Sequence, residues 1–247
     1  MRYKFLTSLL FVICLSLFMN LSGSDAREIN DSNSKKIASL HNGEIPEAPQ
    51  TNEEKMYETL NSNEFEVPNF KIYSQALKGF YLLKEKGLIQ KNILTLIDFS
   101  LSSNKERLWV IDLDTNTIMF NSLVAHGRNS GDEFAGDFSN TPESFKSSLG
   151  FYATAEIYNG KHGMSLRLDG LEKGLNDNAR ERAVVIHGAD YVSNSFIKNN
   201  KRLGRSLGCP AIPVEMTNKI IQTIKDKSCL FIYHSSNSDE IMSHLVS

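Results

Sequence analysis

The pattern of hydrophobic and polar positions divides the chain into a polar N-terminal part and a long region of regular elements. Residues 27–68 are polar and poor in aromatic side chains, and such a segment buries too little surface to order itself. They therefore predict a flexible linker. Regular apolar spacing begins at residue 69 and continues to residue 234, which predicts one folded domain, and residues 235–247 are expected to form a tail.

The spacing of apolar residues within the domain predicts short strands framed by two helices. Apolar and aromatic residues recur at helical spacing from Phe70 to Tyr81, and Gly87 closes this first helix. After Pro213, which suits a first helical turn, the apolar residues of 214–227 share one face and predict the second helix. The fold class expected is mainly β (α+β), with peripheral helices. Runs of β-type residues bounded by Gly, Asn, Asp or Ser occupy 93–99, 107–113, 117–125, 150–158, 164–168, 183–188 and 228–234.

Composition and charge fit a globular protein and exclude one class of partner. The 247 residues are 40% hydrophobic and 23% charged, which is ordinary for a soluble domain. The formal net charge is -2, so the chain has no general electrostatic attraction to nucleic acid. Nucleic acid is therefore not expected as a partner.

The first residues predict export. Arg2 and Lys4 precede an apolar run of about fifteen residues, and small residues follow between Ser22 and Ala26. This order is typical of a cleaved signal peptide, here residues 1–26, and the run is shorter than the roughly twenty residues that span a bilayer. An uncleaved anchor is the alternative. The expected location is the periplasm or cell envelope, with membrane contact only during export unless the signal is retained.

Two cysteines, Cys209 and Cys229, remain after such a cleavage. In an exported protein a disulfide between them is the default alternative to two free thiols. Cys229 lies in an apolar run with alternating faces, where a free cysteine behaves as a small buried hydrophobe. The surroundings of Cys209 indicate a different use.

Three histidines, His126, His162 and His187, each precede a glycine. A structural histidine at a strand end is the plain interpretation of any one of them. Zinc ligation is another, but the sequence has no close ligand pair such as CxxC or HExxH. No metal site is therefore expected.

The segment GRSLGCPAIP surrounds Cys209 with glycine. Gly204 and Gly208 free the backbone for a tight turn and for close approach of a substrate, and backbone N–H groups beside a thiolate can stabilise an oxyanion. Arg205 adds positive charge that favours a thiolate. With a histidine such as His187 at a neighbouring strand end, the residues predict cysteine acyl transfer.

These motifs resemble the L,D-transpeptidases of the YkuD type, and specifically the divergent murein L,D-transpeptidase catalytic domain family. The family signature is a histidine, a gap somewhat under twenty residues, and then Ser/Thr-His-Gly-Cys. This chain has His187, a gap of eighteen residues and then Ser206-Leu207-Gly208-Cys209. The resemblance extends from Phe70 to Tyr233 and includes VAHGRNSG, FSNTPESFKSSLGFY, SLRLDGLEKG and RAVVIHGADYVS.

The resemblance implies a YkuD-like β-sandwich or barrel with Cys209 as nucleophile and His187 as general base. Ser206, Leu207 and Gly208 would shape the turn, and the Gly208 and Cys209 N–H groups are the expected oxyanion hole. The remaining residues expected at the site, Arg205 and Gly188, are assigned to substrate or oxyanion binding. Leu207 replaces the motif histidine, and Pro210 and Ala211 stand where the family usually has an arginine just after the cysteine.

The implied substrates are peptidoglycan stem peptides, as donor and as acceptor of an acyl group. Cys209 would attack the carbonyl of the third stem residue, release the terminal D-residue and pass the thioester to an amine of a second stem. No metal or organic cofactor is expected. Two alternatives stay open: a carboxypeptidase or endopeptidase with the same Cys–His pair, and an inert wall-binding module.

Overall fold

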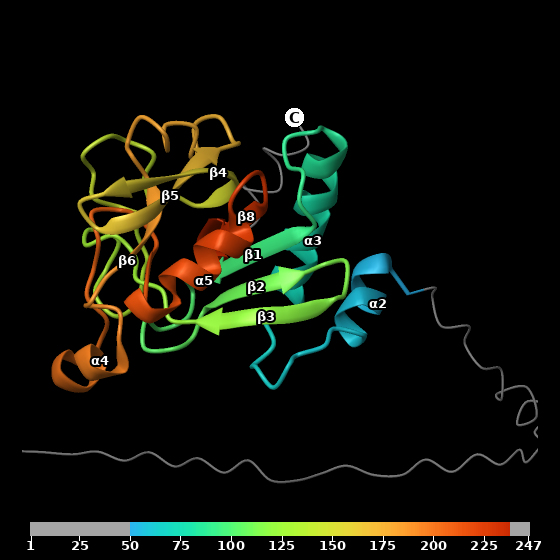
Figure 1. Ribbon diagram of the computed structural model, residues 1–247, viewed down its shortest axis with the longest axis horizontal. Helices are drawn as coiled ribbons and strands as arrows, with labels where there is room; N and C mark the ends of the chain where they lie inside the picture. The colour runs from blue at the N-terminus through green and yellow to red at the C-terminus, as the bar shows by residue number, and fades with distance from the viewer. Residues whose placement is uncertain (1–49, 238–247) are drawn as a thin grey trace, which may run out of the picture. The chain divides into compact units, whose positions relative to one another are not determined.

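A mixed sheet of eight strands forms the centre of the part of the chain that the computed structural model describes, residues 50–237 (Figure 1). The helices of this part are α2 (Asn52–Glu58), α3 (Phe70–Glu85), α4 (Asn194–Asn200) and α5 (Val214–Ile224), with a 3-10 turn at Ser235–Asn237. The strands are β1 (Ile93–Asp98), β2 (Leu108–Asp112), β3 (Thr117–Ser122), β4 (Gly150–Gly160), β5 (Gly163–Gly170), β6 (Val185–Gly188), β7 (Ala211–Ile212) and β8 (Cys229–Tyr233).

The sheet curls until its two edge regions meet. The strand order is β3-β2-β1-β8-β4-β5-β6-β7, with β1/β8 and β6/β7 parallel and the other neighbours antiparallel. Just beyond β3, Ala125 forms a bridge with Ala211 of β7, the strand at the opposite edge. Register shifts in β2/β3 and β4/β5 accompany the curvature. This barrel-like sheet with peripheral helices confirms the predicted mainly β fold.

Helices α3 and α5 cover opposite faces of the sheet (Figure 1). On α3, Gly79 lies against the ring of Phe151 in β4. Thr154, three positions along the same strand, faces the other way, and its hydroxyl donates to the carbonyl of Ile224 at the end of α5. Because strand side chains alternate between faces, each helix seals one face of the central strands, and β1 and β8 are almost wholly buried.

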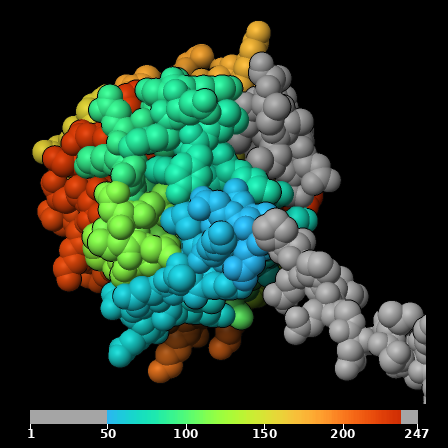
Figure 2. Space-filling model, turned by 90° about the vertical axis from the view of Figure 1, so that its right-hand side faces the viewer, coloured from blue at the N-terminus to red at the C-terminus, as the bar shows by residue number. Residues whose placement is uncertain are grey.

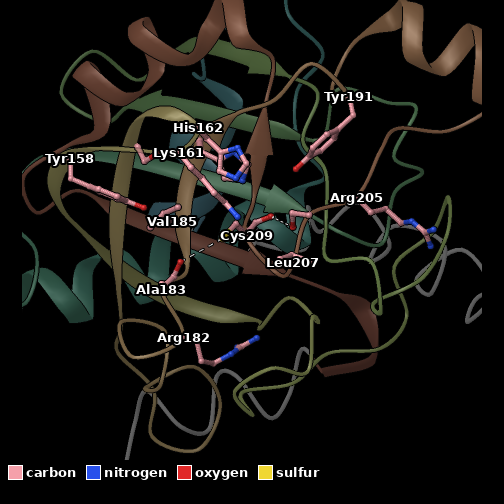
Figure 3. A pocket seen from close by; sticks show the side chains of 13 residues that line it. Tyr158, Lys161, His162, Arg182, Ala183, Val185, Tyr191, Arg205, Leu207 and Cys209 are labelled. Carbon is pink, nitrogen blue, oxygen red and sulfur yellow. Dashed lines mark hydrogen bonds between the residues drawn. The ribbon is translucent and has the colours of Figure 1, made fainter.

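The register of the short strands positions the predicted site. In β6, His187 pairs with Ser165 of β5 on one side and with Ala211 of β7 on the other. Cys209 lies two residues before Ala211, so the ladder fixes the segment that carries the cysteine relative to the histidine. The turn between β4 and β5 lies at the same end of the sheet as this segment (Figure 3).

Residues 50–68, predicted as part of the linker, are ordered against the domain. Helix α2 begins with a capping box in which Thr51 and Glu54 bond reciprocally. Asn61 forms a bridge with Thr117 of β3, and the Trp109 indole N–H donates to the carbonyl of Glu66. Figure 2 shows α2, in blue, packed between α3 and the β2–β3 hairpin. Composition fails here because a few partly buried apolar residues, among them Tyr57 and Phe65, pack against the core, and hydrogen bonds to the domain add to this contact.

Several other boundaries fall at or beyond the described residues. The predicted signal peptide, residues 1–26, the linker up to residue 49, and residues 238–247 of the tail all lie outside them. Within 50–237, no helix is long and apolar enough to cross a membrane. The sequence pattern also did not predict α4 or the two-residue strand β7.

Candidate active site

A pocket of about 410 Å³ opens between the β4–β5 turn, β6 and the turn before β7 (Figure 3). Cys209 and His187 both line it, together with His162 of the β4–β5 turn. The size is within the range of small-molecule sites. Residues from three distant parts of the sequence therefore contribute chemical groups to one cavity.

Ser206 and Gly208 hold the turn that presents Cys209. The Ser206 hydroxyl donates to the Cys209 carbonyl, 2.6 Å away, and accepts from the Gly208 N–H at 3.0 Å. Gly208 has φ +125°, and a Cβ at this position would lie 2.8 Å from the Lys146 carbonyl oxygen. Only glycine fits such a backbone and such a contact. The turn is thus a closed hydrogen-bonded loop around the cysteine.

A second layer of backbone contacts supports this turn from below. The Ser147 hydroxyl donates to the Gly208 carbonyl and accepts from the Gly127 N–H, both at 3.0 Å. The Ser206 N–H donates to the His126 carbonyl, and the Arg128 N–H donates to the Ser206 carbonyl. The motifs VAHGRNSG and FKSSLG therefore act as structural supports for the cysteine turn.

The Cys209 sulfur is a neutral thiol in this arrangement. It donates to the Ala183 carbonyl, 3.7 Å away. Burial raises the pKa of the thiol, and the Val185 N–H and the charges of Arg182 and Lys161 only partly oppose that effect. A thiol that is not ionised at rest requires a base to take its proton when a substrate is attacked.

His187 lines the same pocket and is hydrogen-bonded through one of its two ring nitrogens. Its Nδ1 lies 2.9 Å from the Gly188 carbonyl oxygen, and since a carbonyl only accepts, Nδ1 carries the hydrogen. The other ring nitrogen, Nε2, is then a free acceptor. Burial lowers the pKa of His187, and the charges of His162 and Lys161 lower it further, so the imidazole is neutral and able to accept a proton near neutral pH.

The other two histidines of the sequence have different positions. His126 is buried away from the pocket, where its Nδ1 lies 2.9 Å from the Arg107 guanidinium and its Nε2 lies 3.3 Å from the Gly131 carbonyl. Burial, followed by the Arg107 charge, lowers the pKa of His126 to about 4. It is a structural histidine. His162 lies in the pocket and stacks on His187, with ring centroids 4.4 Å apart.

Arg205 does not stand beside the sulfur as the sequence suggested. It lines the pocket, but its guanidinium turns away from Cys209 (Figure 3) and donates to the Asp132 carboxylate at 2.6 Å and to the Gly131 carbonyl at 3.0 Å. An exposed carboxylate therefore neutralises it. The charges that favour the thiolate come instead from Arg182 and Lys161, neither of which the sequence analysis selected.

The hydrogen bonds of the expected oxyanion donors and of Gly188 differ from what the sequence suggested. The Gly208 N–H donates to the Ser206 hydroxyl, whereas the Cys209 N–H acts on the Cys209 sulfur and lowers its pKa. The Gly188 carbonyl accepts a hydrogen bond from His187 Nδ1, and Gly188 is not among the residues that line the pocket. Leu207 is 52% exposed at the rim of the pocket, so an apolar side chain stands at this position of the turn.

Residues 65–233 match the model of the family described as the L,D-transpeptidase catalytic domain. The match covers more than half of the chain and includes every residue of the pocket. The chain belongs to this family. The resemblance drawn from the sequence motifs is thereby confirmed, while the individual roles of Cys209 and His187 stay predictions.

Solved structures of L,D-transpeptidases are among the similar folds. An L,D-transpeptidase from Mycobacterium smegmatis aligns with a TM-score of 0.36 and 9% identity over 57% of this chain and 58% of that one. The L,D-transpeptidase (Yku) from Stackebrandtia nassauensis aligns with a TM-score of 0.35 and 10% identity, over 66% of this chain and 65% of that one. The helical cell shape determining protein Pgp2 from Campylobacter jejuni aligns with a TM-score of 0.36 and 16% identity, over 68% of this chain and 60% of that one.

The alignments cover less than two thirds of each of those three chains. No curated protein sequence matches this one.

This L,D-transpeptidase domain carries two free cysteines in its described part, and the alternative of a disulfide is not seen. Cys229 is fully buried in β8, between β1 and β4, whereas Cys209 lies at the pocket. Among residues 50–237, no three His, Cys, Asp or Glu side chains are grouped as metal ligands.

Two pocket residues carried weak signals in the sequence. Tyr191 lies four residues after His187 and points its hydroxyl into the pocket (Figure 3), and burial, followed by Cys209, raises its pKa to about 12. Arg182 lies just before β6 and donates to the carbonyls of Ser139 and Lys146. Both lie within the motif RAVVIHGADYVS, which marks the segment but gives no direction for either side chain.

Proposed function

We propose that the chain is an exported cysteine acyltransferase that cross-links peptidoglycan stem peptides through a thioester on Cys209. The observation that carries the proposal is the shared pocket of the Cys209 thiol and the His187 imidazole, with the imidazole fixed as a base by the Gly188 carbonyl. Membership of the L,D-transpeptidase family supports the kind of substrate. The apolar segment after Lys4 supports export.

In the first half-reaction the donor stem acylates the cysteine. The Cys209 proton passes to His187 Nε2 as the sulfur bonds to the carbonyl carbon of the third stem residue. The negative oxygen of the tetrahedral intermediate accepts the Cys209 N–H. The C–N bond to the terminal D-residue then breaks, and the imidazolium returns its proton to the departing amine. The product is a thioester and a free D-amino acid.

In the second half-reaction an amine of another stem attacks the thioester. His187 Nε2 takes a proton from the attacking nitrogen, the C–S bond breaks, and the imidazolium protonates the departing thiolate of Cys209. An amide cross-link forms and both residues return to their neutral states. Each proton and bond is accounted for by groups of this chain and its two substrates, so the proposed reaction needs no metal or organic cofactor.

Incubation of the purified protein with tetrapeptide stems tests the proposal. Mass spectrometry is expected to show release of the terminal D-residue together with stem dimers, and neither product with Cys209→Ala. Tripeptides accumulating without dimers would identify water as the acceptor and make the enzyme a hydrolase. Unchanged tetrapeptides with a protein that melts cooperatively would contradict enzymatic activity and favour an inert wall-binding module.

A further inference from the structure

The pocket is lined by basic side chains and by no acidic one. Lys161, His162, Arg182, His187 and Arg205 contribute to its wall, and no aspartate or glutamate does. The chain as a whole carries a formal net charge of -2, so this concentration of one sign is local. A cavity lined by one sign of charge attracts a ligand of the other sign.

Three of these five basic groups are already engaged within the protein. The Arg205 guanidinium pairs with the Asp132 carboxylate. The Arg182 guanidinium donates to the Ser139 and Lys146 carbonyls and to two serine hydroxyls. His187 uses its Nδ1–H on the Gly188 carbonyl. Of the five side chains, only those of the remaining two residues have no hydrogen-bond or ion-pair partner among residues 50–237.

Those two, Lys161 and His162, form the turn between β4 and β5, where Gly160 pairs with Gly163. Both are exposed, and neither has a hydrogen-bond or ion-pair partner among the described residues. Figure 3 shows Lys161 reaching toward Cys209, and its charge acts on the pKa of that thiol. The His162 ring lies over His187. The turn thus places two unused donors over the nucleophile and the base.

The leaving residue of the proposed reaction brings a carboxylate to the same place. In a tetrapeptide stem the fourth residue is the last, so its free carboxylate lies one residue beyond the attacked carbonyl. The Cα atoms of consecutive residues are about 3.8 Å apart. When that carbonyl carbon is in contact with the Cys209 sulfur, the terminal carboxylate is within reach of a cation beside the sulfur.

We propose that Lys161, assisted by His162, binds the terminal carboxylate of the donor stem and so selects stems that end at the fourth residue. The inference rests on the proposed function and adds to it a specificity-determining residue on the β4–β5 turn. A stem whose fourth residue is amidated or extended lacks this charge and leaves the Lys161 ammonium without its partner. The enzyme would therefore discriminate against it.

Four synthetic donor stems distinguish the terminal carboxylate from a second carboxylate that Lys161 could bind, the one on the side chain of residue three. A diaminopimelate at position three carries a side-chain carboxylate, whereas lysine at that position does not. Each version is prepared with a C-terminal acid and with a C-terminal amide. The rate of release of the fourth residue gives kcat/KM for each donor, and calorimetric binding to Cys209→Ala gives Kd for each donor independently of turnover.

The wild-type enzyme is expected to prefer acids over amides by about tenfold in kcat/KM, whichever residue is at position three. A hydrogen bond between two charged groups accounts for an effect of this size. Lys161→Met should lose most of the preference by slowing the acids more than the amides, because loss of the charge beside the Cys209 thiol slows both kinds of donor, and Lys161→Arg should retain the preference. Lys198→Met is the matched control, since Lys198 is exposed on α4 and does not line the pocket.

Equal rates for acids and amides, or equal losses for both in Lys161→Met, would overturn the inference. A preference that follows the diaminopimelate carboxylate instead would also overturn it. The Kd ratios for Cys209→Ala decide the case in which no donor is turned over. Tighter binding of acids that requires Lys161 would then uphold the carboxylate site while the proposed acyl transfer fails.

Discussion

Replacing Gly208 by alanine should damage the site more than the small size of the added methyl group suggests. Gly208 has φ +125°, and a Cβ there would lie 2.8 Å from the Lys146 carbonyl oxygen. The peptide groups on both sides cannot shift freely, because the Gly208 N–H donates to the Ser206 hydroxyl and its carbonyl accepts from Ser147. The added methyl group therefore has to displace the turn that carries Cys209.

The magnitude follows from the two penalties. A non-glycine residue in a sparsely populated backbone region costs about 1–3 kcal/mol, which lowers the melting temperature by roughly 2–12 °C for a domain of this size. The clash then moves the adjacent sulfur. A displacement of about 1 Å of a reacting group costs about 100-fold in rate, so kcat/KM on tetrapeptide stems should fall by about that factor at a temperature where the variant is folded.

Two other glycines give matched controls for Gly208→Ala. Gly87 has φ +70° but nothing within 4 Å of the added Cβ, so Gly87→Ala measures backbone strain without a clash. Gly136 has open space and no positive φ, so Gly136→Ala measures neither. Thermal melts and turnover are recorded for all three. Gly87→Ala is expected to lower stability and keep activity, and Gly136→Ala is expected to keep both.

Wild-type activity and melting temperature in Gly208→Ala would refute the description of the turn. A loss of stability as large as in Gly87→Ala, with full activity, would show that the turn is strained but that catalysis does not depend on its geometry. A loss of activity in Gly208→Ala that Gly87→Ala and Gly136→Ala do not share would show that catalysis depends on the geometry of this turn.

Three further predictions concern the titratable and thiol groups. Cys209→Ala should abolish turnover with little change in melting temperature, whereas Cys229→Ala should keep activity and lower the melting temperature, because Cys229 is fully buried; large equal losses in both would indicate a disulfide. Alkylation of Cys209 by iodoacetamide should rise at a pH above that of an ordinary thiol, since burial raises the pKa. The profile should move further up in Lys161→Met, and alkylation near neutral pH should slow in His187→Ala more than in His162→Ala; a profile unchanged in both Lys161→Met and His187→Ala would contradict the assigned contacts. Burial also raises the pKa of Glu172 to about 7, so its contribution to stability is complete below the ordinary carboxyl pKa and is lost as pH rises through about 7. The loss of folding free energy is about 3 kcal/mol. The melting temperature of Glu172→Gln should therefore depend less on pH than that of the wild type, and the same pH dependence in both proteins would disprove this assignment.

Seven of the eight strands were predictable because burial leaves a strong local signal. In β1 and β8 nearly every side chain is buried, so continuous apolar runs mark them in the sequence. Helix α2 has no buried residue, and its capping box and tertiary hydrogen bonds involve polar groups that also suit a linker. These polar contacts, together with a few partly buried apolar side chains such as Met56 and Tyr57, explain why residues 50–68 are ordered.

That Cys209 and His187 lie in one pocket was predictable from the sequence, whereas the charged residues around them were not. The spacing between His187 and Cys209 follows a family signature that can be read directly in the sequence. Two charges act on the sulfur, those of Arg182 and Lys161. Lys161 lies on a turn 48 positions away in the chain, and the direction of its side chain depends on the β4–β5 register. Arg205 was the nearest basic residue in sequence, yet its side chain turns to Asp132, which no local pattern reveals.

If Cys209 is an acylating nucleophile, a carbapenem should react with its thiol. Opening of the strained ring drives acylation, and the N–H of Cys209 stabilises the developing oxyanion, so the adduct should accumulate. Intact-protein mass spectrometry is expected to show a single adduct, which peptide mapping places on Cys209 and not on Cys229. Cys209→Ala should show none. A folded wild-type protein that forms no adduct, or one that forms it equally in Cys209→Ala, would contradict the claim.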